Sequence, residues 1–280
     1  MTSTVRTRDG LSLSVEQHLL GGDSGLRGRI VIVHGYAEHK GRYGHVVAAL
    51  LDAGYECLLF DLRGHGRSDG PRGHVVRFAD YRNDLAQIIE TAPVARAPLI
   101  ILGHSLGGLI ALDFAEHRPG IATAVATSSP FLAPAFSVLT NAAWLAGYLL
   151  PAVKVKNRLD PSWLSHDPKV VDAYRRDPLV FDTLTLGWWR EVHQAQVETF
   201  ARAHALEVPL LLMLGDADRI ADPHRSRAFF QNVPTAAKRL AVYAGFFHEV
   251  LNELDRQRVI ADLLAWLDDR STSTVNATRG

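Results

Sequence analysis

The chain has 280 residues, equal numbers of basic (30) and acidic (30) side chains, and 47% hydrophobic residues. That apolar content is enough for one large domain or two small ones, and the balanced charge provides no basic excess to neutralise nucleic-acid phosphates. The lone Cys57 excludes an internal disulfide and lies in an apolar run, so we expect it to be a buried core residue.

Short apolar runs alternate with amphipathic segments along most of the chain. Strands are predicted at 11–20, 30–33, 57–60, 98–102, 122–126, 210–214 and 240–243. Helices are predicted at 42–53, 78–91, 109–117, 223–232 and 256–268. This alternation indicates an α/β protein with a mostly parallel sheet covered on both faces. Ligand sites of such sheets lie beyond the carboxyl ends of the strands.

The alternation stops between residues 130 and 205, where helix formers, tryptophan and proline dominate and no strand pattern is visible. We expect a helical cap inserted at 130–205 between two parts of one core, 1–129 and 206–270. The small, polar segment 271–280 is predicted to be disordered. Residues 1–9 lack the apolar region of a signal peptide, and no stretch is typical of a membrane-spanning helix. A cytoplasmic location is therefore expected.

The sequence Gly103-His104-Ser105-Leu106-Gly107 lies between a predicted strand and a predicted helix. A serine in G-x-S-x-G at such a junction is typical of a nucleophile elbow, a strained turn that lifts the serine Oγ above the start of the helix. Glycines flank the serine because side chains there would clash. The motif predicts a serine hydrolase with Ser105 as its nucleophile and with an acid and then a histidine downstream.

A catalytic serine needs a general base, and the base needs a carboxylate to orient it. Asp216 and Asp218 both follow the strand at 210–214. Asp216 is nearer the strand and could cap the loop, whereas Asp218 lies far enough out to turn back toward the site, so spacing favours Asp218. Asp222 precedes a proline and fits a helix N-cap.

The candidate base is His248, the one histidine of thirteen that follows the last predicted strand. His104 is expected to pack rather than to catalyse. Neither H-E-x-x-H nor a Cys/His cluster is present, so neither a metal nor another cofactor is expected. The oxyanion of the reaction would be bound by two backbone N–H groups, that of Leu106 and that of Tyr36, which follows the strand end at His34-Gly35.

Five segments in this order resemble motifs of monoacylglycerol lipases and related lysophospholipase-like α/β-hydrolases. They are HGYAEHKGRY (34–43), DLRGHGRS (61–68), GHSLGG (103–108), DR (218–219) and GFFHEVLNE (245–253). The resemblance covers about residues 10–267 and implies the α/β-hydrolase fold with a cap and Asp218 as the acid. The chain departs from the family at Tyr36 and Ala37, which replace a small residue and a glycine, and at Phe247, where tyrosine is frequent.

The resemblance implies hydrolysis of monoacylglycerols to fatty acid and glycerol through an acyl-enzyme. Lysophospholipids or other carboxyl esters are the alternative within the same chemistry, and a non-catalytic ligand-binding protein on a hydrolase fold is the alternative from another class. No charged residue lies between 119 and 153. We expect a lid there whose apolar face, including Trp144 and Leu145, lines an acyl pocket and contacts lipid surfaces. The oligomeric state stays open.

Overall fold

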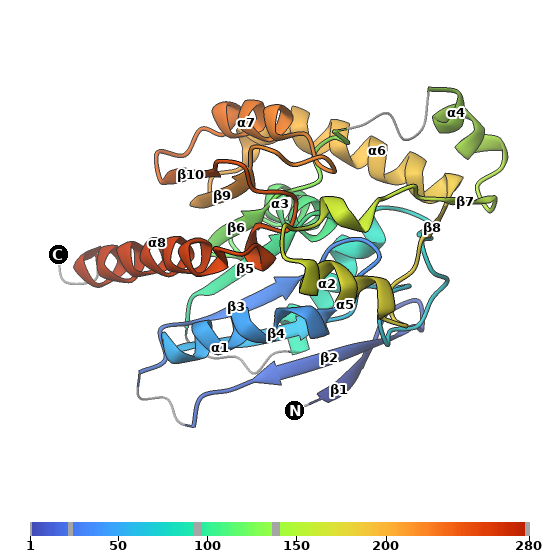
Figure 1. The fold of residues 1–280 in the computed structure, drawn as a ribbon. Helices are drawn as coiled ribbons and strands as arrows, with labels where there is room; N and C mark the ends of the chain where they lie inside the picture. Colours follow the sequence, from blue (N-terminus) through green and yellow to red (C-terminus); the bar gives the residue numbers. More distant parts are fainter. Residues whose placement is uncertain (1, 22–24, 92–96, 136–140, 278–280) are drawn as a thin grey trace.

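The computed structural model describes residues 2–21, 25–91, 97–135 and 141–277, and its centre is an eight-stranded sheet with the order β1-β2-β4-β3-β5-β6-β9-β10 (Figure 1). The strands are β1 (Thr2–Arg6), β2 (Ser12–His18), β3 (Gly28–Val33), β4 (Tyr55–Phe60), β5 (Leu99–His104), β6 (Ala124–Ser128), β9 (Leu210–Gly215) and β10 (Lys238–Tyr243). β2 pairs antiparallel with both β1 and β4. The other neighbouring strands of this sheet, β4, β3, β5, β6, β9 and β10, run parallel. The parallel strands therefore end together at one edge.

Helices cover both faces of this sheet. α1 (Gly44–Asp52) and α8 (Arg256–Ala277) share one apolar core with β3 and β4, and α2 (Ala79–Thr91), α3 (Leu106–His117) and α7 (Pro223–Asn232) share the other. The central strands β3 and β4 are buried on both faces, as a doubly covered sheet requires. Cys57 on β4 is buried, as predicted, and burial raises the pKa of its thiol to about 12.

The fold class predicted from the sequence is confirmed, and each predicted strand has a counterpart. The edge strand β1 was not predicted, because its residues are mostly exposed and polar and have no apolar alternation. The elbow helix α3 begins at Leu106, three residues before the predicted start at 109. The predicted helix 42–53 begins as a 3₁₀ turn (Lys40–Tyr43) before α1.

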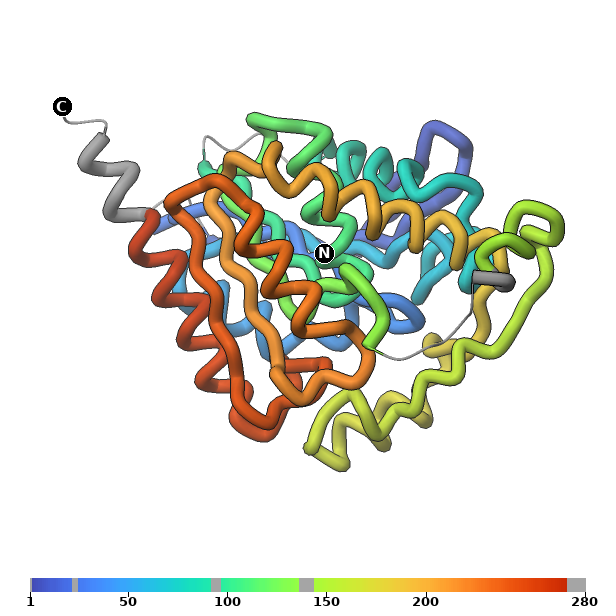
Figure 2. The backbone as a smooth tube through the Cα atoms, turned by 90° about the horizontal axis from the view of Figure 1, so that it is seen from above, coloured from blue at the N-terminus to red at the C-terminus, as the bar shows by residue number. Residues whose placement is uncertain are grey.

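The cap between β6 and β9 is not purely helical, which corrects the prediction of a segment without strands. It contains α4 (Asn141–Leu149), β7 (Lys154–Lys156), the 3₁₀ turn Pro161–Trp163, α5 (Pro168–Arg176), β8 (Thr183–Thr185), α6 (Leu186–Ala201) and the 3₁₀ turn Ala203–Ala205. β7 and β8 pair antiparallel over three residues each, a length too short to leave a periodic pattern in the sequence. Figure 2 shows the yellow-green and gold cap segments on the side of the molecule away from helix α8.

The end of the chain also differs from the prediction. Helix α8 continues through Ala277, so residues 271–277, predicted to be disordered, are helical. Residues 278–280 of that predicted tail lie outside the described part of the chain. Among the described helices, none combines the length and the apolar character needed to cross a membrane.

Glu116 on α3 is a buried acid whose two carboxyl oxygens have no hydrogen-bond partner among the described residues. Burial, with a contribution from Asp113 and against the opposing charge of Arg202, raises the pKa of Glu116 from 4.5 to about 9. In the unfolded chain this carboxyl ionises near its ordinary pKa, so a rising pH lowers the free energy of the unfolded state while the carboxyl of the folded state stays protonated. Glu116 therefore lowers stability progressively between about pH 4.5 and pH 9.

We expect Glu116→Gln to stabilise the protein, because the amide mimics the protonated acid and does not ionise. The difference in unfolding free energy between variant and parent should grow by about 1.4 kcal/mol per pH unit between pH 5 and 9. Urea unfolding at pH 6, 7 and 8 measures it. Glu198→Gln on α6 makes the same substitution at an exposed carboxylate and is the control. Equal effects of the two substitutions would contradict the account of Glu116.

Candidate active site

Ser105 lies at the sharp turn between β5 and α3, at the edge where the parallel strands end. Its backbone has φ 51° and ψ −116°, a region that residues other than glycine rarely occupy. The elbow predicted from G-x-S-x-G is thus present with the strain that such a turn requires. The strained turn holds Ser105 at the start of α3, where it lines a pocket.

The two glycines of the motif are needed for close packing. A Cβ at Gly103 would lie 2.3 Å from the carbonyl oxygen of Gly107, and one at Gly107 would lie 2.1 Å from the carbonyl oxygen of Val33. Both distances are far below van der Waals contact. No side chain fits at either position without moving backbone, so the elbow can form only with glycine at both.

The structure brings Asp218 and His248 together. The loops after β9 and β10 carry them, and His248 Nδ1 lies 2.8 Å from Asp218 Oδ2. Asp218 Oδ1 accepts the backbone N–H groups of Ile220 and Ala221, which fix the carboxylate's orientation. Both side chains are buried. The carboxylate is therefore fixed where it can select the ring tautomer that leaves Nε2 free as a base.

The competing aspartates have other partners. Asp216 accepts the N–H of Gly245 at 2.6 Å and so joins the loops after β9 and β10. Asp222 accepts the N–H of His224 and is the N-cap of α7, with a proline in the first turn, as the sequence predicted. Of these three aspartates, Asp218 is the one that contacts His248.

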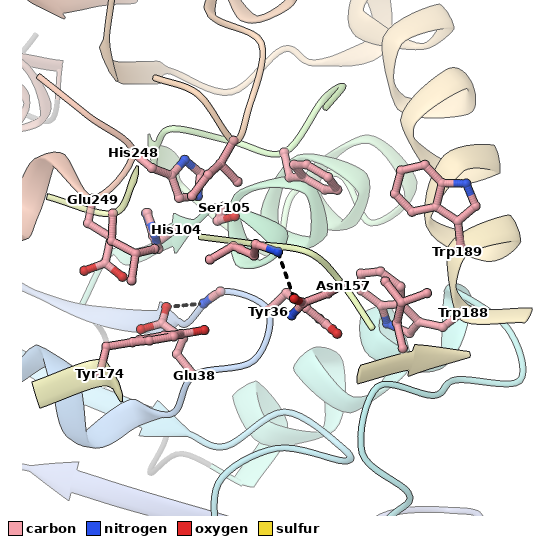
Figure 3. A pocket seen from close by; sticks show the side chains of 16 residues that line it. Tyr36, Glu38, His104, Ser105, Asn157, Tyr174, Trp188, Trp189, His248 and Glu249 are labelled. Atoms are coloured by element: carbon pink, nitrogen blue, oxygen red, sulfur yellow. Dashed lines mark hydrogen bonds between the residues drawn. The ribbon is translucent and has the colours of Figure 1, made fainter. Parts of the chain in front are cut away.

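His248 lies beside Ser105 in the close-up of the pocket (Figure 3). These two described residues are not joined by a hydrogen bond in the structure, and catalytic hydrogen bonds often tighten only when substrate binds. Burial disfavours the charged imidazole, but Asp218, and more weakly Glu249 and Glu38, together raise the pKa of His248 above its ordinary value. His248 is thus held near a carboxylate that stabilises its imidazolium form.

His104 packs beside the site and forms a hydrogen-bonding contact through Nδ1 with the carbonyl oxygen of Ser128. Burial, and then the nearby His248, lower the pKa of His104 to about 4, so this ring is neutral at pH 7. The expectation that His104 packs therefore agrees with its surroundings.

The residues of the two predicted oxyanion donors, Leu106 and Tyr36, are each adjacent in the chain to Ser105 or to a residue that lies against it. Leu106 is the first residue of α3, where backbone N–H groups have no intrahelical acceptor. Tyr36 follows Gly35, a residue that lies against Ser105. Neither the Leu106 N–H nor the Tyr36 N–H has a hydrogen-bond partner in the described part of the chain. Ala37, which replaces the family's glycine, has a φ of 61°, a conformation that glycine adopts more easily.

A buried charge cluster, which we call the Glu38–Arg42–Glu249 cluster, borders the pocket beside His248. Arg42 donates two hydrogen bonds to Glu249, at 2.6 and 2.8 Å, and one to Glu38 at 2.7 Å. Tyr43 and the N–H of Gly35 also donate to Glu38. Although burial opposes ionisation, Arg42 and the other neighbours lower the pKa of Glu38 to about 2. Two carboxylates on one guanidinium leave the cluster with one net negative charge.

In the sequence these three residues were recognised only as members of two motifs, and no role was predicted for them. Glu38 and Arg42 are four residues apart, but Glu249 is more than 200 residues away in the chain. A signal for the pairing was nevertheless present, because Glu249 is adjacent to the candidate base and two of the three residues lie in one motif.

Ser105 lies in the middle of a pocket with about 640 Å³ of empty space, including its open mouth. Figure 3 shows Glu38, Tyr174 and Glu249 on one side of Ser105 and the two tryptophans, Trp188 and Trp189, on the other. The apolar side also includes Phe131 and Leu184. The pocket therefore has a polar end and an apolar end, with Ser105 between them.

The lid was predicted to line the pocket through the uncharged stretch 119–153, but the cap lines it through its later part. Among the described residues of that stretch, only Phe131 reaches the pocket. Helix α4 instead exposes apolar side chains, with Leu145 59% and Leu149 79% exposed. The expectation that Trp144 and Leu145 line an acyl pocket is thus corrected, and the later cap residues Leu184, Trp188 and Trp189 take that place.

Comparisons with known proteins agree with this architecture. The model of the family described as serine aminopeptidase, S33 (Hydrolase_4) matches residues 24–255. The monoacylglycerol lipase of Mycolicibacterium smegmatis is 37% identical over 88% of this chain and 89% of its own length. The phospholipase YtpA of Bacillus subtilis is 31% identical over 85% of this chain and 94% of its own length.

Solved structures show the same fold. The crystal structure of the monoacylglycerol lipase of Paleococcus ferrophilus superimposes with a TM-score of 0.83 and 32% sequence identity, and the match covers 91% of this chain and 98% of that one. A family model that spans most of the chain, and relatives above 30% identity over nearly their whole length, are sufficient to assign the family. The chain belongs to the serine aminopeptidase S33 (Hydrolase_4) family and is a serine hydrolase of the α/β-hydrolase fold.

Proposed function

We propose that this protein hydrolyses monoacylglycerols to fatty acid and glycerol through an acyl-enzyme on Ser105. The observation that carries the proposal is the position of Ser105, on a strained elbow beside the His248–Asp218 pair and between the apolar and the polar end of one pocket. A monoacylglycerol has a matching order of groups. Its acyl chain fits the apolar end, its ester carbonyl lies at Ser105, and its neutral diol fits the polar end. The names of the relatives support the same substrate class.

The proposed reaction begins when Ser105 Oγ attacks the ester carbonyl while His248 Nε2 removes the hydroxyl proton. Asp218 holds the ring and stabilises the imidazolium that forms. The N–H groups of Tyr36 and Leu106 bind the oxyanion, each contributing about 3 kcal/mol to the transition state. His248 then gives its proton to the leaving glycerol oxygen, and it activates the water that hydrolyses the acyl-enzyme.

The charge of the polar end favours a glycerol over a phosphate headgroup. The Glu38–Arg42–Glu249 cluster has one net negative charge and abundant hydrogen-bond acceptors. Glycerol hydroxyls can donate to such acceptors, whereas a phosphodiester would be repelled. Lysophospholipid hydrolysis, which the phospholipase relative makes the second candidate, is therefore expected to be the slower reaction.

A substrate panel tests this choice. At equal acyl chain length, we expect kcat/KM for the monoacylglycerol to exceed that for the lysophosphatidylglycerol, whose headgroup has one net negative charge, by about tenfold or more. A p-nitrophenyl ester of the same acid reports intrinsic acyl transfer. Faster hydrolysis of the lysophospholipid would overturn the preference but not the chemistry, and no turnover of any ester would favour a non-catalytic binding protein.

We further propose that the exposed apolar face of α4 brings the enzyme to lipid surfaces. Leu145, Tyr148 and Leu149 on α4, and Leu150 directly after it, are about half exposed or more, and the helix has no charged residue. Burial of such apolar side chains in a lipid interface lowers the free energy of the system and so favours binding. Peripheral association of the protein with membranes follows from this proposal.

We expect Leu145→Asp to lower the hydrolysis of long-chain monoacylglycerol presented in vesicles by about tenfold. Hydrolysis of water-soluble p-nitrophenyl acetate should change little, because Leu145 does not line the pocket. The matched control is Leu19→Asp, a leucine of similar exposure that follows β2. An equal loss on both substrates, or an equal loss in the control, would argue against a lipid-contacting α4.

A further inference from the structure

The side chain of Tyr36 is a feature separate from its backbone N–H. It lines the pocket and lies between Ser105 and Trp188 in the close-up (Figure 3). We propose that this ring ends the apolar arm of the pocket and thereby sets the length of acyl chain that the enzyme accepts. The inference rests on the proposed function, and it gives a role to a position where the resembled family has a small residue.

The ring is enclosed by aromatic neighbours. Its centroid lies 4.5 Å from that of Trp188, 5.4 Å from that of Phe181 and 6.0 Å from that of His65. The hydroxyl donates a hydrogen bond to the carbonyl oxygen of Thr183, at 2.7 Å. Burial raises the pKa of Tyr36, so the hydroxyl stays protonated as the donor. The ring is thus fixed between the Ser105 loop and strand β8 of the cap.

Trp188, which lines the apolar arm, is itself held in place. Its Nε1–H donates to the hydroxyl of Tyr81 at 3.0 Å, and its backbone N–H donates to Thr185 Oγ1 at 3.1 Å. Thr185 in turn donates its N–H to the carbonyl oxygen of Gly73. These bonds prevent Trp188 from moving far into space vacated by a smaller residue at position 36. A cavity therefore remains when that ring is shortened.

A second hollow adjoins the Ser105 pocket. Asn157, Leu159 and Tyr174 line both spaces, and Phe181, which packs edge-on to Tyr36, lines the second hollow alone. Tyr36 lines only the Ser105 pocket, so its ring lies between that pocket and Phe181, a wall of the second hollow. Removing the ring would extend the Ser105 pocket toward Phe181 rather than create an isolated void.

Each additional methylene buried in the extended arm should raise kcat/KM by about fourfold. We expect Tyr36→Leu to move the best monoacylglycerol substrate to an acyl chain at least two methylenes longer than the best chain of the parent. Tyr36→Trp, which adds volume at the same position, should move the optimum to shorter chains. Tyr36→Phe keeps the ring and loses only the hydroxyl with its hydrogen bonds to Thr183 and Asn157, so its chain-length profile should match that of the parent.

The experiment measures kcat/KM over a series of saturated monoacylglycerols from C6 to C18 for the full-length parent and the three variants. Thermal unfolding of each variant checks its fold, and Tyr36→Trp decides the question if Tyr36→Leu does not fold. Shifts in opposite directions for Leu and Trp, with none for Phe, support the proposal. An unchanged profile in a folded Leu or Trp variant, or the same shift in Phe as in Leu, overturns it.

Failure of the inference about Tyr36 can be distinguished from failure of the proposed function. A parent enzyme that hydrolyses no monoacylglycerol would refute the proposed substrate and leave no profile to compare. A parent that hydrolyses monoacylglycerols with a chain-length optimum independent of residue 36 would refute only the role of the Tyr36 side chain.

Discussion

Replacing Ser105 with alanine is expected to lower kcat for ester hydrolysis by about 10⁵- to 10⁶-fold. Alanine removes the attacking oxygen but keeps a Cβ that the elbow already accommodates, so the strained turn and the pocket should persist. Substrate binding should be largely retained, because the apolar and polar ends of the pocket are untouched.

The measurement is kcat and KM for a p-nitrophenyl ester, with binding of a non-hydrolysed ether analogue as a second readout. Thermal unfolding should show a stable variant, because the backbone strain at position 105 does not depend on the hydroxyl and is the same with alanine. Hydrolysis within about tenfold of the parent rate would contradict the role of Ser105 as the nucleophile.

Replacing Asp218 with asparagine is expected to cost about 10⁴-fold in kcat. The amide can donate to the imidazole and stabilise the wrong ring tautomer, with the proton on Nε2 where the base must be free. Asp218 also raises the pKa of His248 against the effect of burial. Without the carboxylate the imidazole deprotonates at lower pH, so the rising limb of the pH–rate profile should move to lower pH.

Asp216→Asn provides the matched control two residues away. Its oxygen can still accept the N–H of Gly245, so a loss of less than about tenfold and an unshifted pH profile are expected. A larger effect at Asp216 than at Asp218 would reverse the assignment of the acid. Equal losses at both would point to a general disturbance of the loop after β9.

The sequence was sufficient for the parts of the fold that depend on local patterns. The doubly buried strands β3, β5 and β9 are continuous apolar runs, and α7 begins with an aspartate N-cap followed by proline. Ser105 could be found because only glycine fits on either side of the elbow. These features are fixed by a few neighbouring residues, which a single sequence displays directly.

Features that depend on distant contacts could not be predicted in the same way. The three-residue strands β7 and β8 form because they pair with each other, and neither has a pattern of its own. The pairing of Arg42 with Glu249, and the enclosure of Tyr36 by Trp188 and Phe181, join segments far apart in the chain. The exposed apolar face of α4 was predicted to line the pocket, because an uncharged helix has the same sequence pattern whether it faces a pocket or solvent.

The most direct test of the account is covalent labelling of the nucleophile. A p-nitrophenyl alkylphosphonate transfers its phosphonyl group to an activated serine and releases p-nitrophenolate, which leaves an adduct that resists hydrolysis. We predict one phosphonyl group per chain, located on Ser105 by peptide mass mapping, with complete loss of esterase activity and no labelling of Ser105→Ala. Equal labelling of Ser105→Ala, or an adduct on another residue that accompanies the loss of activity, would contradict Ser105 as the nucleophile.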